Sequence, residues 1–403
     1  MNNKGYPFVL VHGMSGWGDT STLNQFLPYW GFAKFDIAAI LNARGYETYA
    51  ASVSPLGSAW DRTCELYAQL TGTRVDYGKA HSEKFGHERY GRTYKKPLFE
   101  GWGEKDESGH VRKVNLIAHS FGGVSLRMLS VLLEDGCAEE REATTDGSLS
   151  PLFEGGHGGL IFSITTICSP HNGTDMEFAV PSLFRKVLKT AYYEISHVSA
   201  NVPGLRDLFD VQLEHFGVGK KGSFFGIKEY SKFKKSGDNV FYDVGVDGSH
   251  RINKSLRTLD DIYYFSFAVC GTKESQSGDQ KPQLGVMMTG LMPMAYYMGL
   301  HTEITPDGNV VDRSWEANDG VVNTRSAMAP SGEPSVNYDP SNIEKGVWNI
   351  MPTVKGNHGS VIGWFRDQKS TMPLFCSHVR RIEALTAREN ARNAKEETYA
   401  AVE

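Results

Sequence analysis

The sequence lacks the features that mark membrane-spanning, disulfide-stabilised and nucleic-acid-binding proteins. No apolar run reaches the ~18 uninterrupted residues of a spanning helix, because the longest candidates, 116–133 and 286–300, are interrupted by Gly, Ser, Arg or Pro. The five cysteines are widely spaced and form no C-x-x-C pair, which argues against a disulfide framework and an all-cysteine zinc site. A formal net charge of −5 leaves no basic footprint, so we expect no nucleic-acid partner.

The chain also contains no internal repeat, low-complexity tract or long Pro/Ser-rich linker. Its 403 residues suffice for one large domain or two ordinary ones, and the lack of a linker favours a single domain over 1–403. The opening MNNKGYPFVLVHG has no apolar core followed by a small-residue cleavage site, so we predict no signal peptide in this chain.

Short apolar runs alternate with helical patterns along the chain. Five runs of strand length, rich in β-branched and aromatic residues, cover 6–11, 48–53, 113–118, 160–168 and 262–270. Nearly continuous apolar strands are typical of parallel sheets that are buried on both faces. We therefore predict an α/β fold with a mostly parallel central sheet flanked by helices. Three segments depart from the alternation: a polar insertion at 57–99, a helical cover at 178–216 and a charged final helix at 380–400.

The segment KVNLIAHSFGGVSLRML carries the main chemical signal. A predicted strand ends at Ala118, and AHSFGG then leads into a helical pattern, which is a nucleophile elbow of the form A-x-S-x-G. The tight strand-to-helix turn strains the backbone of Ser120 and presents its hydroxyl above the sheet. Flanking positions must be small, and Ala118 and the two glycines satisfy that requirement. We therefore predict Ser120 as the nucleophile.

The first predicted strand ends in VHGM, which places a loop beside the elbow. A backbone N–H from this loop and the N–H after the nucleophile can bind the oxyanion that develops on the substrate. We assign these two donors to Met14 and Phe121. His12 is expected to be structural, because this fold places the catalytic base after the nucleophile in the chain.

The base and the acid must follow Ser120 in the chain. His358 lies in a loop between an apolar run and the final helix, where the base is expected. Asp319 lies in ANDGVV, at a turn that leads into a new element, and would fix the tautomer of the imidazole. The alternatives that remain open are His301 and His378 for the base and Asp307 and Asp312 for the acid.

Several motifs together resemble the zinc-containing bacterial lipases of thermophilic bacilli and staphylococci, within the α/β-hydrolase superfamily. The matching segments span most of the chain: LVHGMSGWG at 10–18, the block 44–94, LIAHSFGG at 116–123, LSPLFEGGHGG at 149–159, ITTICSPHNGT at 164–174, NDGVVNT at 318–324 and GVWNIMPT at 346–353. The resemblance implies a single α/β-hydrolase domain that acts on long-chain esters under a helical lid. It assigns Ser120, Asp319 and His358 to a catalytic triad, in agreement with the chemical argument.

The same resemblance interprets the polar insertion. Members of this family are similar in carrying a zinc ion bound by two Asp and two His, and the matching positions here are Asp61, His81, His87 and Asp243. Two imidazoles and two carboxylates can fill a closed tetrahedral shell, as expected of a structural zinc site.

A second metal of the family is not expected here. Related lipases bind calcium through acidic residues just after the catalytic histidine, whereas HGSVIGWFRD has Ser360 and Phe365 at two of these positions. Asp367 is the one nearby carboxylate, and calcium needs six or more oxygen ligands. The sequence therefore argues against a calcium site.

Between 175 and 240 the resemblance weakens, and apolar residues such as Val180 and Leu183 alternate with Arg185 and Lys186. We expect an amphipathic lid helix that opens at a lipid surface, against the alternative of a helix packed permanently on the core. The expected function is triacylglycerol hydrolysis through an acyl-enzyme at a lipid–water interface. The alternatives are a phospholipase, a short-chain carboxylesterase, a non-catalytic lipid-binding protein and a metal-dependent hydrolase. Secretion is implied by the resemblance alone, and the oligomeric state is not predicted.

Overall fold

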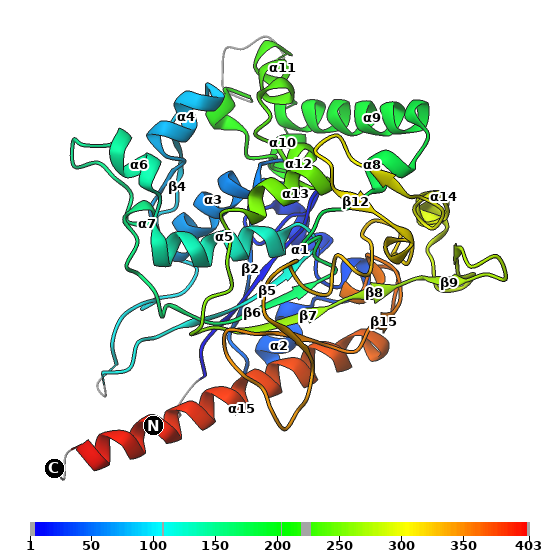
Figure 1. Cartoon of the computed structure of the whole chain (residues 1–403). Coiled ribbons are helices and arrows are strands. Elements are labelled where there is room, and N and C mark those ends of the chain that lie inside the picture. Colours follow the sequence, from blue (N-terminus) through cyan, green and yellow to red (C-terminus); the bar gives the residue numbers. More distant parts are fainter. Residues whose placement is uncertain (1–4, 107–108, 203, 219–226, 401–403) are drawn as a thin grey trace.

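The computed structural model describes residues 5–106, 109–202, 204–218 and 227–400 (Figure 1). Its central sheet has seven strands in the order β13-β14-β7-β6-β5-β1-β2, and every neighbouring pair is parallel. These strands are β1 (Phe8–Val11), β2 (Thr48–Ala51), β5 (Val114–His119), β6 (Ile161–Ile167), β7 (Tyr263–Phe267), β13 (Ser335–Asn337) and β14 (Trp348–Ile350). Each of the five predicted strand segments contributes a strand to this sheet, so the predicted α/β architecture is confirmed.

Both faces of the sheet are covered by helices (Figure 1). Along β1, Val9 and Val11 belong to one buried cluster, whereas Phe8 and Leu10 belong to another, because successive side chains of a strand point to opposite faces. The first cluster includes α3 (Ala59–Thr71) and α5 (Gly122–Asp135). The second includes α2 (Ile37–Ala43) and the long final helix α15 (Gln368–Ala400). Nearly continuous apolar strands are therefore required by burial on both sides.

The predicted final helix at 380–400 is the C-terminal part of α15. The structure begins this helix well before residue 380, and Phe375, Val379 and Ile382 are buried against the sheet. The helix is thus part of the core along its apolar side. None of the helices in the described ranges is long and apolar enough to span a membrane.

Three groups of elements are added to this layered core. The stretch 57–99 begins with α3 and continues through β3 (Arg74–Asp76), α4 (Lys79–Phe85) and β4 (Tyr90–Thr93), with β3 and β4 antiparallel. The region 175–240 contains α8 (Met176–Ala179), α9 (Ser182–Asn201), α10 (Leu205–Leu208) and α11 (Ile227–Ser236), while its residues 203 and 219–226 lie outside the described residues. The stretch 271–318 contains the hairpin β9 (Thr272–Glu274)–β10 (Gln280–Pro282), α14 (Met292–Met298) and the hairpin β11 (Glu303–Ile304)–β12 (Val310–Val311).

The remaining short α-helices and strands connect these layers. They are α1 (Thr22–Phe26), α6 (Ala138–Ala143), α7 (Pro151–Glu154), α12 (Val240–Asp243), α13 (Val246–Asn253), β8 (Val269–Cys270) and β15 (Val354–Lys355). Strands β8 and β15 pair in parallel beyond the main sheet. The chain reaches the loop that contains His358 directly after β15.

Candidate active site

Ser120 lies in the tight turn between β5 and α5. Its φ of 55° is in the left-handed region, which is strained for a residue with a side chain, and its N–H donates to the Ile167 carbonyl at 2.8 Å. A Cβ atom on Gly122 would lie 2.7 Å from the Val11 carbonyl oxygen, and one on Gly123 would lie 2.2 Å from Ser169 Oγ. The turn therefore accepts only glycine at these two positions, as the elbow motif predicts.

The three predicted triad residues form one hydrogen-bonded line. His358 Nε2 lies 2.9 Å from Ser120 Oγ, and His358 Nδ1 lies 2.8 Å from Asp319 Oδ2. Ser120 is 7% exposed, the His358 side chain 12% and Asp319 1%. Such a line lets the imidazole take the hydroxyl proton while the carboxylate stabilises the imidazolium.

The structure places the alternative bases and acids away from Ser120. His301 lies 3.5 Å from Glu303, and His378 bonds to Thr165 Oγ1 within the core. Asp307 is paired with Arg251 on the surface, and the carboxylate of Asp312 caps a short 3₁₀ helix. Among the candidates, only His358 and Asp319 are brought to the nucleophile.

The acid is held by its own turn. Asp319 Oδ1 accepts hydrogen bonds from the N–H groups of Val321 and Val322 at 2.9 and 2.8 Å. The N–H of His358 donates to the Asp319 carbonyl at 3.0 Å. The second carboxylate oxygen is therefore aimed at the imidazole, and the backbones of the acid and base loops are joined.

The two predicted oxyanion donors flank the nucleophile. A Cβ on Gly13 would lie 2.5 Å from Ser120 Cβ, so the loop that carries Met14 lies directly against the elbow. Phe121 is the N-cap residue of α5, where a backbone N–H has no acceptor within the helix. The positive end of the α5 dipole lies at the same place. The two N–H groups can together hold a developing negative charge.

Two residues that the sequence analysis missed connect the oxyanion loop to the base. The hydroxyl of Tyr29 accepts the N–H of Gly13 at 3.2 Å and donates to Nδ1 of His119 at 2.7 Å. Nε2 of His119 donates in turn to the His358 carbonyl at 2.9 Å. Burial, and then the neighbouring His358, holds the pKa of His119 well below its usual value, so this imidazole stays neutral. The position directly before Ser120 could have signalled His119, but no motif marks Tyr29.

Cys168 also lies close to the triad. It follows β6, has a φ of 55° and is fully buried. Its Sγ lies within 4.8 Å of a nitrogen of His119 and a nitrogen of His358. Burial raises the pKa of this thiol well above its usual value, with a further contribution from Asp319. The thiol therefore stays protonated beside the triad.

A second cluster of acids and histidines forms at the 57–99 stretch. The carboxylates of Asp61 and Asp238 and the imidazoles of His81 and His87 place one ligand atom each within 4.8 Å of one another. His81 Nε2 lies 3.0 Å from Asp238 Oδ2 and 3.5 Å from Asp61 Oδ1, and His87 Nε2 lies 3.2 Å from Asp238 Oδ2. These separations are close to the roughly 3.3 Å edge of a tetrahedron with zinc–ligand bonds of about 2.0–2.2 Å.

The predicted fourth ligand, Asp243, does not join this cluster, and Asp238 takes its place. Asp243 is the last residue of α12, and its Oδ2 accepts the N–H of Ala59 at the start of α3 at 2.8 Å. Asp238 precedes that helix and faces the two imidazoles. Burial raises the pKa of Asp243 to about 7, whereas the pKa of Asp238 is lowered, against its burial, chiefly by hydrogen bonds and charge from His81. The geometry therefore favours Asp238 over the predicted Asp243 as the fourth ligand.

The local hydrogen bonds of the cluster suit a metal. Asp61 Oδ1 is buried and has no hydrogen-bond partner among the described residues, which is costly unless a cation is present. His87 Nδ1 donates to the Glu88 carbonyl at 2.9 Å, which leaves Nε2 as the free ligand atom. His215, another residue that the sequence analysis missed, has its Nε2 3.0 Å from Asp61 Oδ2 and orients that carboxylate.

The loop after His358 is stabilised by its own polar groups. Ser360 Oγ accepts the N–H of Asn357 at 2.8 Å, and Asn357 Oδ1 accepts the N–H of Ser360 at 3.1 Å. Phe365 is 63% exposed, and the Asp367 carboxylate accepts the N–H of Ser370 at the start of α15 at 2.8 Å. The absence of calcium stays a prediction, and this loop has protein hydrogen bonds that can hold it.

Comparison with known proteins gives matches over most of the chain. A family model described as "Lipase-like, C-terminal domain" matches residues 3–376. The lipase of Staphylococcus hyicus is 35% identical over 368 residues, which are 89% of this chain and 53% of that protein. The chain spans about half the length of the curated relatives it matches.

Solved structures match the fold at similar identity. The crystal structure of Staphylococcus hyicus lipase superposes with a TM-score of 0.80 at 33% identity, covering 97% of this chain and 98% of that one. The structure of EstA from Clostridium botulinum superposes with a TM-score of 0.79 at 34% identity, covering 94% and 87%. The predicted α/β-hydrolase fold class and the predicted resemblance to staphylococcal proteins are confirmed.

Proposed function

Because the chain belongs to the family of lipase-like C-terminal domains, we propose that it is a serine hydrolase that cleaves the carboxylic esters of long-chain acylglycerols. The observation that carries this proposal is the hydrogen-bonded line from Ser120 through His358 to Asp319, with backbone donors on both sides of the nucleophile. Relatives that are named lipases support the substrate class. Secretion stays a prediction from the resemblance.

The geometry suggests how the residues divide the work. His358 Nε2 takes the proton of Ser120 as its oxygen attacks the ester carbonyl, and the N–H groups of Met14 and Phe121 hold the oxyanion. The carbon–oxygen bond of the ester then breaks, and the protonated His358 gives its proton to the leaving alcohol. A water molecule, deprotonated by His358, next attacks the acyl-enzyme, and the released oxygen of Ser120 regains a proton. Asp319 keeps the imidazole oriented throughout.

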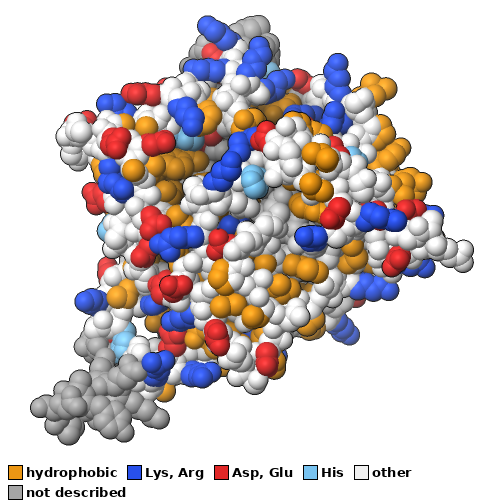
Figure 2. Space-filling view, viewed as in Figure 1, with side chains coloured by type: hydrophobic (Ala, Val, Ile, Leu, Met, Phe, Trp, Pro, Cys, Tyr) orange, Lys and Arg blue, Asp and Glu red, His pale blue; other side chains and the backbone are white. Residues whose placement is uncertain are grey.

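We further propose that α9 is the lid. The helix has an inner side with Tyr193, Ser196 and Ala200 buried. Its outer side carries four large apolar residues that are 74%, 57%, 67% and 47% exposed, namely Leu183, Val187, Ile195 and Val198. Figure 2 shows hydrophobic side chains among Lys and Arg at the upper right of the molecule, where α9 and α14 lie in Figure 1. A face of this kind suits transient contact with a lipid surface.

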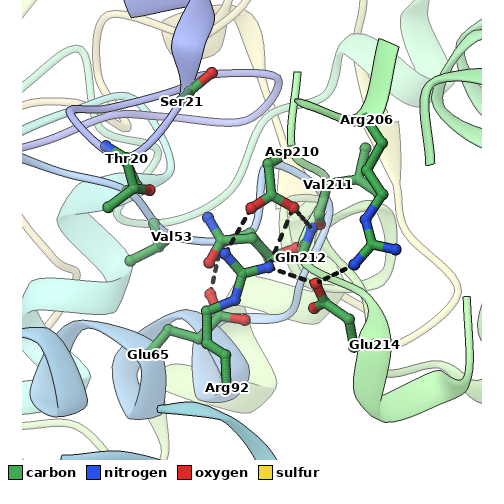
Figure 3. A network of polar contacts seen from close by, with 12 residues as sticks. Thr20, Ser21, Val53, Glu65, Arg92, Arg206, Asp210, Val211, Gln212 and Glu214 are labelled. Carbon is green, nitrogen blue, oxygen red and sulfur yellow. Dashed lines mark hydrogen bonds and ion pairs between the residues drawn. The ribbon is translucent and has the colours of Figure 1, made fainter. Parts of the chain in front are cut away.

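Polar contacts tie the lid to the catalytic side of the molecule. The hydroxyls of Tyr192 on α9 and Ser15, the residue after Met14, lie 2.5 Å apart. The segment that follows α10 is held separately. Its Asp210 and Glu214 are both bound by Arg92 of β4, which donates to both carboxylate oxygens of Asp210 (Figure 3). We infer that the Arg92 network anchors the segment after α10, while the contact between Tyr192 and Ser15 breaks when the helix opens.

We also propose a structural zinc ion at Asp61, His81, His87 and Asp238. The donor set is two imidazoles and two carboxylates, which suits zinc and leaves no open position for a substrate. When bound, the ion would supply a cross-link between α3, α4 and the segment before α12. We therefore assign the cluster a stabilising role, and we do not favour the alternative that the protein is a metal-dependent hydrolase.

The test is titration of the fatty acid released from a long-chain triacylglycerol emulsion by the wild type, Ser120→Ala and Ser130→Ala. Ser130 is a matched control, because it is a buried serine of α5 whose Oγ donates to the Arg127 carbonyl. We expect release by the wild type and the control, and a loss of about 10⁵–10⁶-fold in Ser120→Ala.

The other outcomes are equally informative. Equal release by Ser120→Ala and the wild type would overturn the nucleophile. Release from phospholipid or from short soluble esters, with none from triacylglycerol, would move the substrate class to the phospholipase or carboxylesterase alternatives. A rate that shows no jump when a soluble ester aggregates would contradict the role given to α9.

A further inference from the structure

The buried guanidinium of Arg62 binds the loop that carries His12, Gly13 and Met14, which we call the oxyanion loop. Arg62 lies in the first turn of α3 and is fully buried. Its Nη2 donates to the His12 carbonyl, its Nη1 to the Ser54 carbonyl at 2.5 Å, and its Nε to Ser125 Oγ at 3.2 Å. The guanidinium is thus directed at backbone oxygens and one hydroxyl. Because these acceptors carry no formal charge, the three hydrogen bonds hold local backbone geometry and do not form an ion pair.

These contacts fix two successive peptide groups. The carbonyl of His12 that Arg62 binds belongs to the same peptide as the N–H of Gly13, which donates to the Tyr29 hydroxyl. The next peptide joins the carbonyl of Gly13 to the N–H of Met14. That Gly13 carbonyl accepts Nδ1–H of His12 at 2.8 Å, because the N–H of Val53 donates to the other ring nitrogen and sets the tautomer. Of the four polar groups in these two peptides, the N–H of Met14 is therefore the one left to bind an oxyanion, and the other three are held by hydrogen bonds.

The same guanidinium also contacts the other side of the oxyanion hole. The Cζ atom of Arg62 lies 5.6 Å from the centroid of the Phe121 ring, and Ser125 is on the helix that Phe121 caps. One buried side chain therefore contacts Phe121, which carries one predicted donor, and His12, which lies two residues before the other donor, Met14. Oxyanion donors are effective to the extent that they are held in place before the reaction.

We propose that Arg62 is a positioning residue for the oxyanion hole, which aligns the Met14 and Phe121 N–H groups through the His12 carbonyl and the Phe121 ring. This inference rests on the proposed hydrolase function. Because the hole binds charge that exists only in the transition state, the loss of Arg62 lowers kcat and leaves KM nearly unchanged. It also weakens a bound tetrahedral anion that imitates that state.

The experiment compares Arg62→Met and Arg62→Lys with Arg127→Met. Arg127 is the matched control, since it is also a buried arginine, lies on α5 and bonds Asn253 Oδ1 at 2.9 Å, away from the loop. Each variant is assayed for thermal unfolding, zinc content, kcat and KM on a soluble p-nitrophenyl ester, and affinity for an alkyl boronic acid. The boronic acid forms a tetrahedral anion on Ser120, so its affinity reports the hole directly.

We expect Arg62→Met to lose roughly 10–100-fold in both kcat and boronic acid affinity, below the cost of removing a donor outright. Arg62→Lys keeps the charge but not the three-way fork, so an intermediate loss is expected. Arg127→Met should melt at a lower temperature and keep kcat within about threefold of the wild type, as expected for a buried residue outside the site.

Two results would overturn the proposal. One is a folded Arg62→Lys or Arg62→Met with wild-type kcat and boronic acid affinity. The other is an equal loss in Arg127→Met, which would make the effect one of general stability. If Arg62→Met does not fold, Arg62→Lys decides by the same criterion. Failure of the proposed function itself would be seen separately, as a wild type that hydrolyses no ester and binds no boronic acid.

Discussion

The catalytic triad and the metal cluster both combine buried carboxylates with histidines, but the chain delivers these residues in different ways. Ser120 follows β5, and His358 follows β14 of the same sheet by way of the short strand β15, so strand ends deliver two members of the triad. The metal cluster instead takes Asp61 from α3, His81 from α4, and His87 and Asp238 from loops. The ends of parallel strands meet at one edge of a sheet, whereas no comparable rule tells which carboxylate of an irregular segment faces a histidine.

The electrostatics of the two regions differ as well. In the triad, one imidazole lies between a carboxylate and a neutral hydroxyl, so a proton can move along the line. In the metal cluster, two carboxylates face two imidazoles, and the contacts with Asp238 and Asp61 raise the pKa of His81 to about 9 against the opposing effect of burial, which is the largest single influence. The first arrangement moves a proton, while the second concentrates negative charge around a position suited to a cation.

Among the Asp→Asn substitutions that compare the two regions, the largest expected effect is that of Asp319→Asn. The amide cannot hold the imidazole in the tautomer that accepts the Ser120 proton, so we expect kcat to fall about 10⁴-fold. The fold should persist, because an amide oxygen can still accept the N–H groups of Val321 and Val322. Steady-state kinetics with a soluble ester and thermal unfolding measure the two quantities. A variant that keeps a tenth of the wild-type kcat would remove Asp319 from the triad.

The same substitution in the other region should have the opposite profile. Asp238→Asn removes a carboxylate that contacts both His81 and His87, so we expect zinc affinity to fall by at least about 100-fold and the unfolding temperature to fall with it. We expect kcat per folded molecule to stay within about threefold of the wild type. Competition with a zinc chelator and thermal unfolding with and without zinc are the measurements.

The matched control for Asp238 is Asp243→Asn. Burial raises the pKa of Asp243 to about 7, so an amide closely imitates its protonated form, and zinc affinity should be unchanged. If Asp243→Asn lost zinc while Asp238→Asn retained it, Asp243 would be the fourth ligand, as the sequence resemblance implies, and Asp238 would not.

The smallest expected effect concerns Asp175, a buried acid that lies in neither region. Burial raises its pKa to about 7, while a hydrogen bond from Asn323 opposes the shift. Because the folded protein then binds this proton more tightly than the unfolded chain, stability falls as pH rises from about 4 to about 7. Asp175→Asn removes this dependence, so its unfolding free energy should fall less steeply with pH, by at most about 1.4 kcal/mol per pH unit.

Urea unfolding of wild type and Asp175→Asn at pH 4.5, 5.5 and 6.5, with a chelator present in every sample, measures that slope. Parallel curves for the two proteins would show that Asp175 is ionised in the folded state across this range. A positively charged group near Asp175 would then be needed to stabilise its buried carboxylate.

The sequence alone reached the fold and the triad because both depend on local patterns. The five apolar runs were long enough to identify strands, and AHSFGG identified the elbow from adjacent residues. Chain order then restricted the base and the acid to a few candidates, of which His358 and Asp319 are the ones that the structure brings to Ser120. Motifs of adjacent residues carry this information because the strained turn itself requires them.

The rest depended on contacts between distant segments. Asp238 and Asp243 are five positions apart in one short segment, and only the start of α12 at Val240 decides which of them faces the histidines. Tyr29, His119 and Arg62 act through bonds to residues that are between 8 and 239 positions away in the chain. No pattern in a single sequence encodes such pairings.

The sequence by itself therefore determined the parallel sheet and the nucleophile elbow, and it limited the base and the acid to a few candidates. The sheet and the elbow follow from periodicity or from neighbouring residues whose conformations are coupled through the backbone. Only the tertiary structure decided the fourth member of the metal cluster, the contact between Tyr192 of α9 and Ser15 beside the oxyanion loop, and the bond from Arg62 to the His12 carbonyl. These depend on which side chains meet across the folded core, and packing between remote segments settles that question.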